Sequence, residues 1–193
     1  MKPYASLKEL PENYQLKVHI NMKSSPRDFW IIQFGSLILL VPFIFPIVWG
    51  FFPFLNGWNL ESIQPVLIYT LILQIPMIVV HEWIHGIVYK QGTDHKITYK
   101  FHGFAASASV PGIYFYLRHY LKVGLAPAVL LSILFIILTI FSTGIWQAIW
   151  YFMLAIHFAS CVGDFYVSFR IRKLPQDTLI EDYGIGMRVY VHQ

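Results

Sequence analysis

The fold is decided by residues 65–89, PVLIYTLILQIPMIVVHEWIHGIVY, where an apolar run ends in three ionisable side chains. The run is long enough to cross the hydrocarbon core of a bilayer, which takes about 20 apolar residues. The whole chain agrees, since 56% of its 193 residues are hydrophobic. Only 12% are charged, against about 25% in a typical soluble domain. A soluble protein of this size could not bury so much apolar surface in one core, so the bilayer must be part of the solvent.

Three more apolar runs of similar length flank this one. The sequence predicts transmembrane helices at residues 29–54, 65–89, 123–141 and 145–169, within a single membrane-embedded domain of residues 1–193. A short turn, Ser142-Thr143-Gly144, joins the last two helices. The expected class is therefore an all-α integral membrane protein with four transmembrane helices.

Lysine and arginine set the expected orientation. With four spans, all fourteen basic residues fall on one side of the membrane, in residues 1–28, 90–122 and 170–193. The positive-inside rule makes that side cytoplasmic. We therefore expect a multi-pass protein of the cell (cytoplasmic) membrane, with a cytoplasmic N-terminal segment (1–28) and a cytoplasmic tail (170–193). The net charge of +4 does not indicate nucleic-acid binding, because the basic residues flank apolar runs instead of forming a stripe.

The insert between the second and third helices, residues 91–121, has a strand-like character. Residues 97–101 alternate as in a β-strand, and residues 103–111 are rich in small side chains and end in Pro111-Gly112. This pattern suggests a small cytoplasmic β-hairpin. Such a hairpin could hold a substrate in extended form by strand addition. A plain connecting hairpin near the headgroups is an equal alternative.

The chemistry is carried by His81-Glu82-Trp83-Ile84-His85, an HExxH pattern. On a helix, residues four apart share a face, so both imidazoles can reach one Zn²⁺ ion. Glu82 can then accept a proton from a zinc-bound water and act as general base. The alternative is a polar cluster at the membrane boundary, hydrogen-bonded to neighbouring helices.

A zinc site of this kind takes a third protein ligand, and depth in the membrane decides between two candidates. Counted from the nearest cytoplasmic charge, His85 and His81 lie five and nine residues inside the second helix, and Asp164 lies six residues inside the fourth. His157 lies thirteen residues inside, about 20 Å, which is too deep unless the fourth helix is shifted. We therefore predict His81, His85 and Asp164 as ligands, with His157 lining the cavity or serving as an alternative ligand.

These residues carry a family resemblance. HExxH in a membrane helix, with Gly163-Asp164 on a later helix, resembles the site-2 protease class of intramembrane metalloproteases. The closer resemblance is to a family of small bacterial membrane proteins described as putative zincin metallopeptidases. It lies in residues 81–86, 110–114, 125–127, 157–164 and 174–182. The resemblance implies zinc ligands at His81, His85 and Asp164, and a catalytic Glu82.

The leading hypothesis is a membrane-embedded zinc metallopeptidase that hydrolyses a membrane-associated protein or peptide near the cytoplasmic face of the lipid bilayer. A second hypothesis is a non-peptidase zinc hydrolase that acts on a lipid-like substrate with the same groups. A third is a catalytically inactive membrane scaffold or regulator. Replacing Glu82 with Gln separates an enzyme from a scaffold, because this change removes the base and leaves the ligands.

Overall fold

The computed structural model describes residues 5–21, 24–50, 60–103 and 106–193. Within them, four helical segments are long and apolar enough to cross a membrane, as predicted. They are Pro26–Val48, Ile63–Lys90, Leu117–Phe141 and Gly144–Ile171. The predicted end of the first span, at residue 54, lies outside the described residues. The chain is therefore a multi-pass membrane protein.

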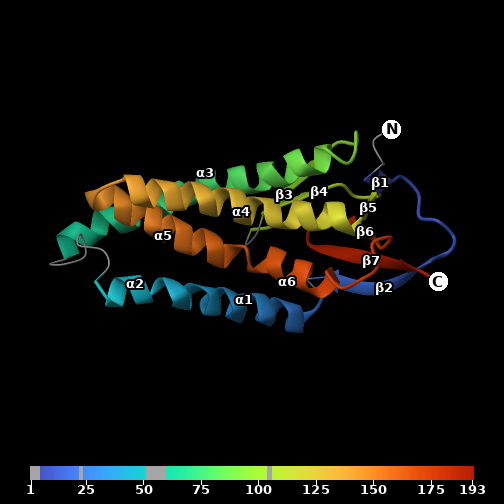
Figure 1. Ribbon diagram of the computed structural model, residues 1–193, viewed down its shortest axis with the longest axis horizontal. Helices are drawn as coiled ribbons and strands as arrows, with labels where there is room; N and C mark the ends of the chain where they lie inside the picture. The colour runs from blue at the N-terminus through green and yellow to red at the C-terminus, as the bar shows by residue number, and fades with distance from the viewer. Residues whose placement is uncertain (1–4, 22–23, 51–59, 104–105) are drawn as a thin grey trace.

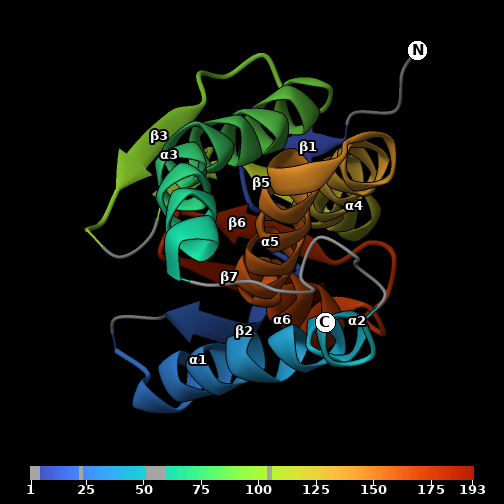
Figure 2. The same ribbon diagram turned by 90° about the vertical axis from the view of Figure 1, so that its left-hand side faces the viewer.

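The four segments are built from six α-helices. The first consists of α1 (Pro26–Leu40) and α2 (Phe45–Val48), joined by a 3₁₀ turn, and the second is α3 (Leu60–Lys90). The third is α4 (Leu117–Phe141), and the fourth is α5 (Gly144–Ser160) followed by α6 (Val162–Ile171). The α5–α6 segment lies between α1 on one side and α3 with α4 on the other (Figure 2).

The outward faces of these helices are apolar. Leu71 on α3 and Ile140 on α4 are each about two-thirds exposed, and many neighbours are similar. Such a surface is costly in water but is what a bilayer requires.

The prediction of an all-α fold is wrong, because the polar segments at both chain ends form a sheet together with a short strand from the insert between α3 and α4. Strands β1 (Ser6–Leu7), β2 (Tyr14–Asn21), β5 (Tyr114–Tyr116), β6 (Leu179–Asp182) and β7 (Gly186–His192) pair in the order β1-β5-β6-β7-β2, all antiparallel. The sheet covers one end of the helical bundle (Figure 1). Buried side chains from the sheet, among them Ile20, Phe115 and Val189, pack in one core with Leu117 and Tyr89 at the helix ends.

The predicted hairpin in the insert is confirmed. Strands β3 (Thr98–Phe101) and β4 (Ala106–Ser109) pair antiparallel, and Tyr99 faces Ala108 in the register. The hairpin packs beside α3, at the level where the helix meets the sheet. It is therefore well placed to border a site on α3.

The fourth span is not the continuous helix that we expected at residues 145–169. It is interrupted at Cys161, which ends α5 and begins α6 with a ψ of 2°. The Ser160 hydroxyl donates to the carbonyl of His157 and so closes the last turn of α5. This interruption puts His157 in the last turn of one helix and Asp164 in the first turn of the next.

Candidate metal centre

The two histidines of the motif meet in front of the C-terminal half of α3. The helical spacing of four brings His81 and His85 onto one face, and their Nε2 atoms lie 3.1 Å apart. Both side chains are largely buried, with exposed fractions of 12% and 10%. Two Nε2 atoms at this distance would repel each other if both carried a lone pair and nothing lay between them. They therefore need either a proton shared in a hydrogen bond or a cation between them.

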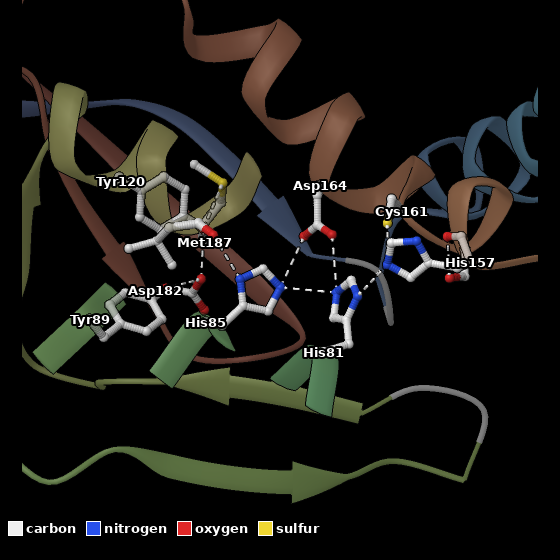
Figure 3. Close-up of polar contacts among 11 residues, drawn as sticks. His81, His85, Tyr89, Tyr120, His157, Cys161, Asp164, Asp182 and Met187 are labelled. Carbon is white, nitrogen blue, oxygen red and sulfur yellow. Dashed lines mark hydrogen bonds and ion pairs between the residues drawn. The ribbon is translucent and has the colours of Figure 1, made fainter. Parts of the chain in front are cut away.

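Asp164 completes a triangle of donors (Figure 3). Its Oδ2 lies 3.4 Å from Nε2 of His81, and its Oδ1 lies 3.6 Å from Nε2 of His85. In a tetrahedral zinc site with bonds of about 2.0–2.2 Å, ligand atoms lie roughly 3.3–3.6 Å apart. The three observed distances, 3.1, 3.4 and 3.6 Å, are close to that spacing, with the last two measured to the two oxygens of the same carboxylate. Two imidazoles and one carboxylate therefore fit a zinc ion, in both geometry and donor chemistry.

The second nitrogen of each histidine is engaged on the side away from this triangle. Nδ1 of His85 lies 2.8 Å from the carbonyl oxygen of Val123, to which it must donate. This contact leaves the Nε2 lone pair of His85 free for a metal. Nδ1 of His81 lies 3.4 Å from Nε2 of His157, which can accept its proton in the same way.

His157 thus lies nearer to the site than the depth estimate indicated. Because α5 ends at Ser160, His157 lies in the last turn before the break, and its Nε2 contacts Nδ1 of His81. It contacts the far nitrogen of His81 and lies outside the triangle. In this geometry His157 can accept the Nδ1 proton of His81 and so hold that ring in place.

Glu82 lines the cavity in front of the triangle. The cavity has a volume of about 410 Å³ and is bordered by α1, α3, α4, α6, strand β4 and the β6–β7 turn. The backbone amide of Ala108, on β4, faces the Glu82 carboxylate. The carboxylate therefore lies between the face of α3 that carries His81 and His85 and the backbone of a strand.

A further carboxylate beside the cavity, the half-buried Asp182, is not singled out by any motif in the sequence. Its Oδ2 accepts hydrogen bonds from the hydroxyls of Tyr89 (2.9 Å) and Tyr120 (2.6 Å), and its Oδ1 accepts one from the backbone N–H of Gly184 (2.8 Å). Burial raises the pKa of Asp182 above its ordinary value of 3.8, and these hydrogen bonds oppose the rise. The cluster ties the sheet to α3 and α4 beside His85. Tyrosines at span ends are common interfacial residues, so no feature of the sequence singled these two out.

Comparison with known proteins gives one match. A family model described as putative zincin peptidase matches residues 74–179, which is more than half of the chain. Neither the curated proteins nor the solved structures gave a match. The matched segment runs from α3 to the first residue of β6, so it contains the donor triangle, Glu82 and the β3–β4 hairpin. The chain therefore belongs to the putative zincin peptidase family.

Proposed function

We propose that this protein is a zinc-dependent metallopeptidase that cuts a membrane-associated protein or peptide where the helical bundle meets the sheet. The observation that carries the proposal is the triangle of His81, His85 and Asp164, with Glu82 beside it in a cavity. These three residues would hold the zinc ion. When bound, zinc would act as a Lewis acid that polarises a water molecule and the substrate carbonyl.

Glu82 is the general base in this proposal. Its carboxylate would accept the proton that the attacking water gives up, and would then pass a proton to the leaving amine. The Ala108 amide holds the carboxylate on the cavity side of α3. The Val123 carbonyl and the His157 ring keep the Nδ1 protons on His85 and His81, so that both Nε2 atoms stay available.

Strand β4 would present the substrate. A peptide bond inside a helix is shielded by its own hydrogen bonds, so a peptidase needs an extended substrate. Residues 106–109 have small side chains, Ala-Ser-Ala-Ser, and three of them line the cavity that also contains Glu82. Among the described strands, β4 pairs with β3 alone, and a substrate strand could add along its other side.

We place the sheet on the cytoplasmic side. The basic residues in the described part of the chain lie in the segments that form or flank the sheet end, and positive charge is retained in the cytoplasm. Cleavage at this level would release a peptide or domain near the cytoplasmic face. That chemistry would be of the kind performed by site-2 proteases.

The test compares Glu82→Gln with the wild-type protein, purified in detergent and loaded with zinc. A lost general base should lower hydrolysis of fluorogenic peptides with apolar stretches by about 10²–10⁴-fold, while the zinc content stays at one per chain. Glu181→Gln is a matched control, since Glu181 pairs with Arg188 on the sheet, and should retain activity. His81→Ala should lose both zinc and activity.

The same variant separates the alternatives. Glu82→Gln should accumulate an uncleaved membrane protein that can be isolated with it from cells. If wild-type protein instead hydrolyses bilayer lipids and no peptide, the peptidase proposal is wrong and the lipid hydrolase takes its place. If Glu82→Gln retains every cellular phenotype of the wild type, the protein acts as a scaffold.

A further inference from the structure

A second group of donors lies behind the triangle, at the break between α5 and α6. Nε2 of His157 lies 3.4 Å from Nδ1 of His81 and 3.5 Å from Sγ of Cys161. One donor from each of the three residues lies within 4.8 Å of the other two, and Figure 3 shows His157 joined by dashed lines to both His81 and Cys161. His157 and Cys161 are fully buried.

We propose that His81, His157 and Cys161 form a second, regulatory metal site, which binds a soft ion such as Cu⁺ or Cd²⁺ and competes with the zinc site for His81. The proposal rests on the proposed function for the role of His81. Thiolate and imidazole ligands together select soft or borderline ions. With the bond lengths of zinc, about 2.0–2.1 Å to nitrogen and about 2.3 Å to sulfur, nitrogen–nitrogen and nitrogen–sulfur pairs in a tetrahedral site lie roughly 3.4 and 3.6 Å apart, close to the two distances observed.

The protonation of His157 supports a site at this position. Its Nδ1 is buried and has no hydrogen-bond partner in the described part of the chain. When His81 carries its proton on Nδ1, as zinc binding through Nε2 requires, Nε2 of His157 accepts from it and the proton of His157 is on Nδ1. A buried N–H without a partner is costly. The folded protein tolerates this unpaired N–H, and the Nε2 lone pair of His157 is thereby left facing His81 and Cys161.

His81 cannot serve both sites as a neutral ring. Binding zinc through Nε2 leaves the proton on Nδ1, whereas binding a soft ion through Nδ1 requires the proton to move to Nε2. Cys161 would give its thiol proton to the buffer when the ion binds. A soft ion at the second site therefore withdraws one ligand from the zinc site and inhibits the enzyme.

Cys161 is the single cysteine of the chain, so a cadmium–thiolate charge-transfer band reports on this site alone. We would titrate the purified protein with Cd²⁺ in detergent and follow ultraviolet absorbance. The wild type should develop the band to one Cd²⁺ per chain. Cys161→Ser, which is nearly isosteric, and His157→Leu should not, while both elute and melt as folded protein. Cys161→Ala repeats the test if serine perturbs the helix break. No band in the wild type, or an unchanged band in His157→Leu, would overturn the proposal.

Competition tests the sharing of His81. Zinc held at about ten times its own Kd should raise the cadmium midpoint roughly tenfold in the wild type. In Asp164→Ala, which weakens the zinc site, the shift should be small. An equal shift in both proteins refutes the sharing. Glu82→Gln should keep the band while losing peptidase activity. If the wild-type protein shows the band but no peptidase activity, the proposed function is refuted and the second site stands.

Discussion

Asp164 is the residue on which the zinc site can be tested most directly. It is the carboxylate of the donor triangle, and each of its two oxygens faces one imidazole, at 3.4 and 3.6 Å. Asp164→Asn keeps the volume of the side chain and removes its charge. A good control is Asp182→Asn, because Asp182 borders the same cavity but its oxygens accept hydrogen bonds from Tyr89, Tyr120 and Gly184.

The expected loss of zinc affinity in Asp164→Asn follows from the position of Asp164, whose oxygens lie at the distances expected of a zinc ligand from both imidazoles. Loss of a residue that only supports a metal ligand typically costs 10–100-fold in affinity, so loss of the charged ligand should cost at least about 100-fold, or roughly 2.7 kcal/mol. Asp182→Asn should cost less than about tenfold, because it changes no ligand. Zinc affinity would be measured in detergent by competition with a chromogenic chelator, and stoichiometry by elemental analysis. If Asp164→Asn binds zinc within about threefold of the wild type while His81→Ala does not bind it, Asp164 is not a ligand.

Three further predictions concern the surroundings of the site. His157→Leu should lower zinc affinity about 10–100-fold, because the His81 ring loses its hydrogen-bond acceptor. His157→Gln restores an acceptor and should recover part of the lost affinity. Equal losses of affinity in both variants would mean that His157 only packs against His81. Tyr120→Phe should lower the free energy of unfolding by about 1.5–3 kcal/mol in thermal melts, because it removes a hydrogen bond to the half-buried carboxylate of Asp182. An unchanged melting temperature would contradict this. Gly184→Ala should lower the free energy of unfolding by about 1–3 kcal/mol, since Gly184 has a φ of +100° and a Cβ there would lie 2.8 Å from the Ser107 hydroxyl oxygen. Gly112→Ala is the control, because Gly112 has a φ of +78° but open space around it, so this change measures the backbone contribution alone.

The helices were predictable because the bilayer imposes one simple requirement. A long uncharged run must be helical in lipid to satisfy its own backbone, whatever its neighbours do. The sheet has no such local cause. Its strands pair residues far apart in the chain, such as Tyr14 with His192, and none is longer than eight residues. Even so, residues 14–21 alternate polar and apolar side chains, with Leu16, Val18 and Ile20 as the apolar set, and this signal was overlooked.

The candidate site shows where counting along a helix holds and where it fails. The depth of Asp164 was counted from Arg170, and all of those residues belong to the continuous helix α6, so a fixed rise per residue applies to them. The count to His157 crosses the interruption at Cys161, where the rise and direction of the chain change. The depth predicted for His157 was therefore wrong, since its ring contacts His81 although counting residues placed it too deep in the membrane. Neither Pro nor a Gly–Ser pair marks that break, and the Ser160 hydroxyl bond that closes α5 is visible only in three dimensions. Local motifs and short counts thus locate the candidate ligands, whereas the position of the neighbouring His157 depends on a helix break that no sequence pattern predicts.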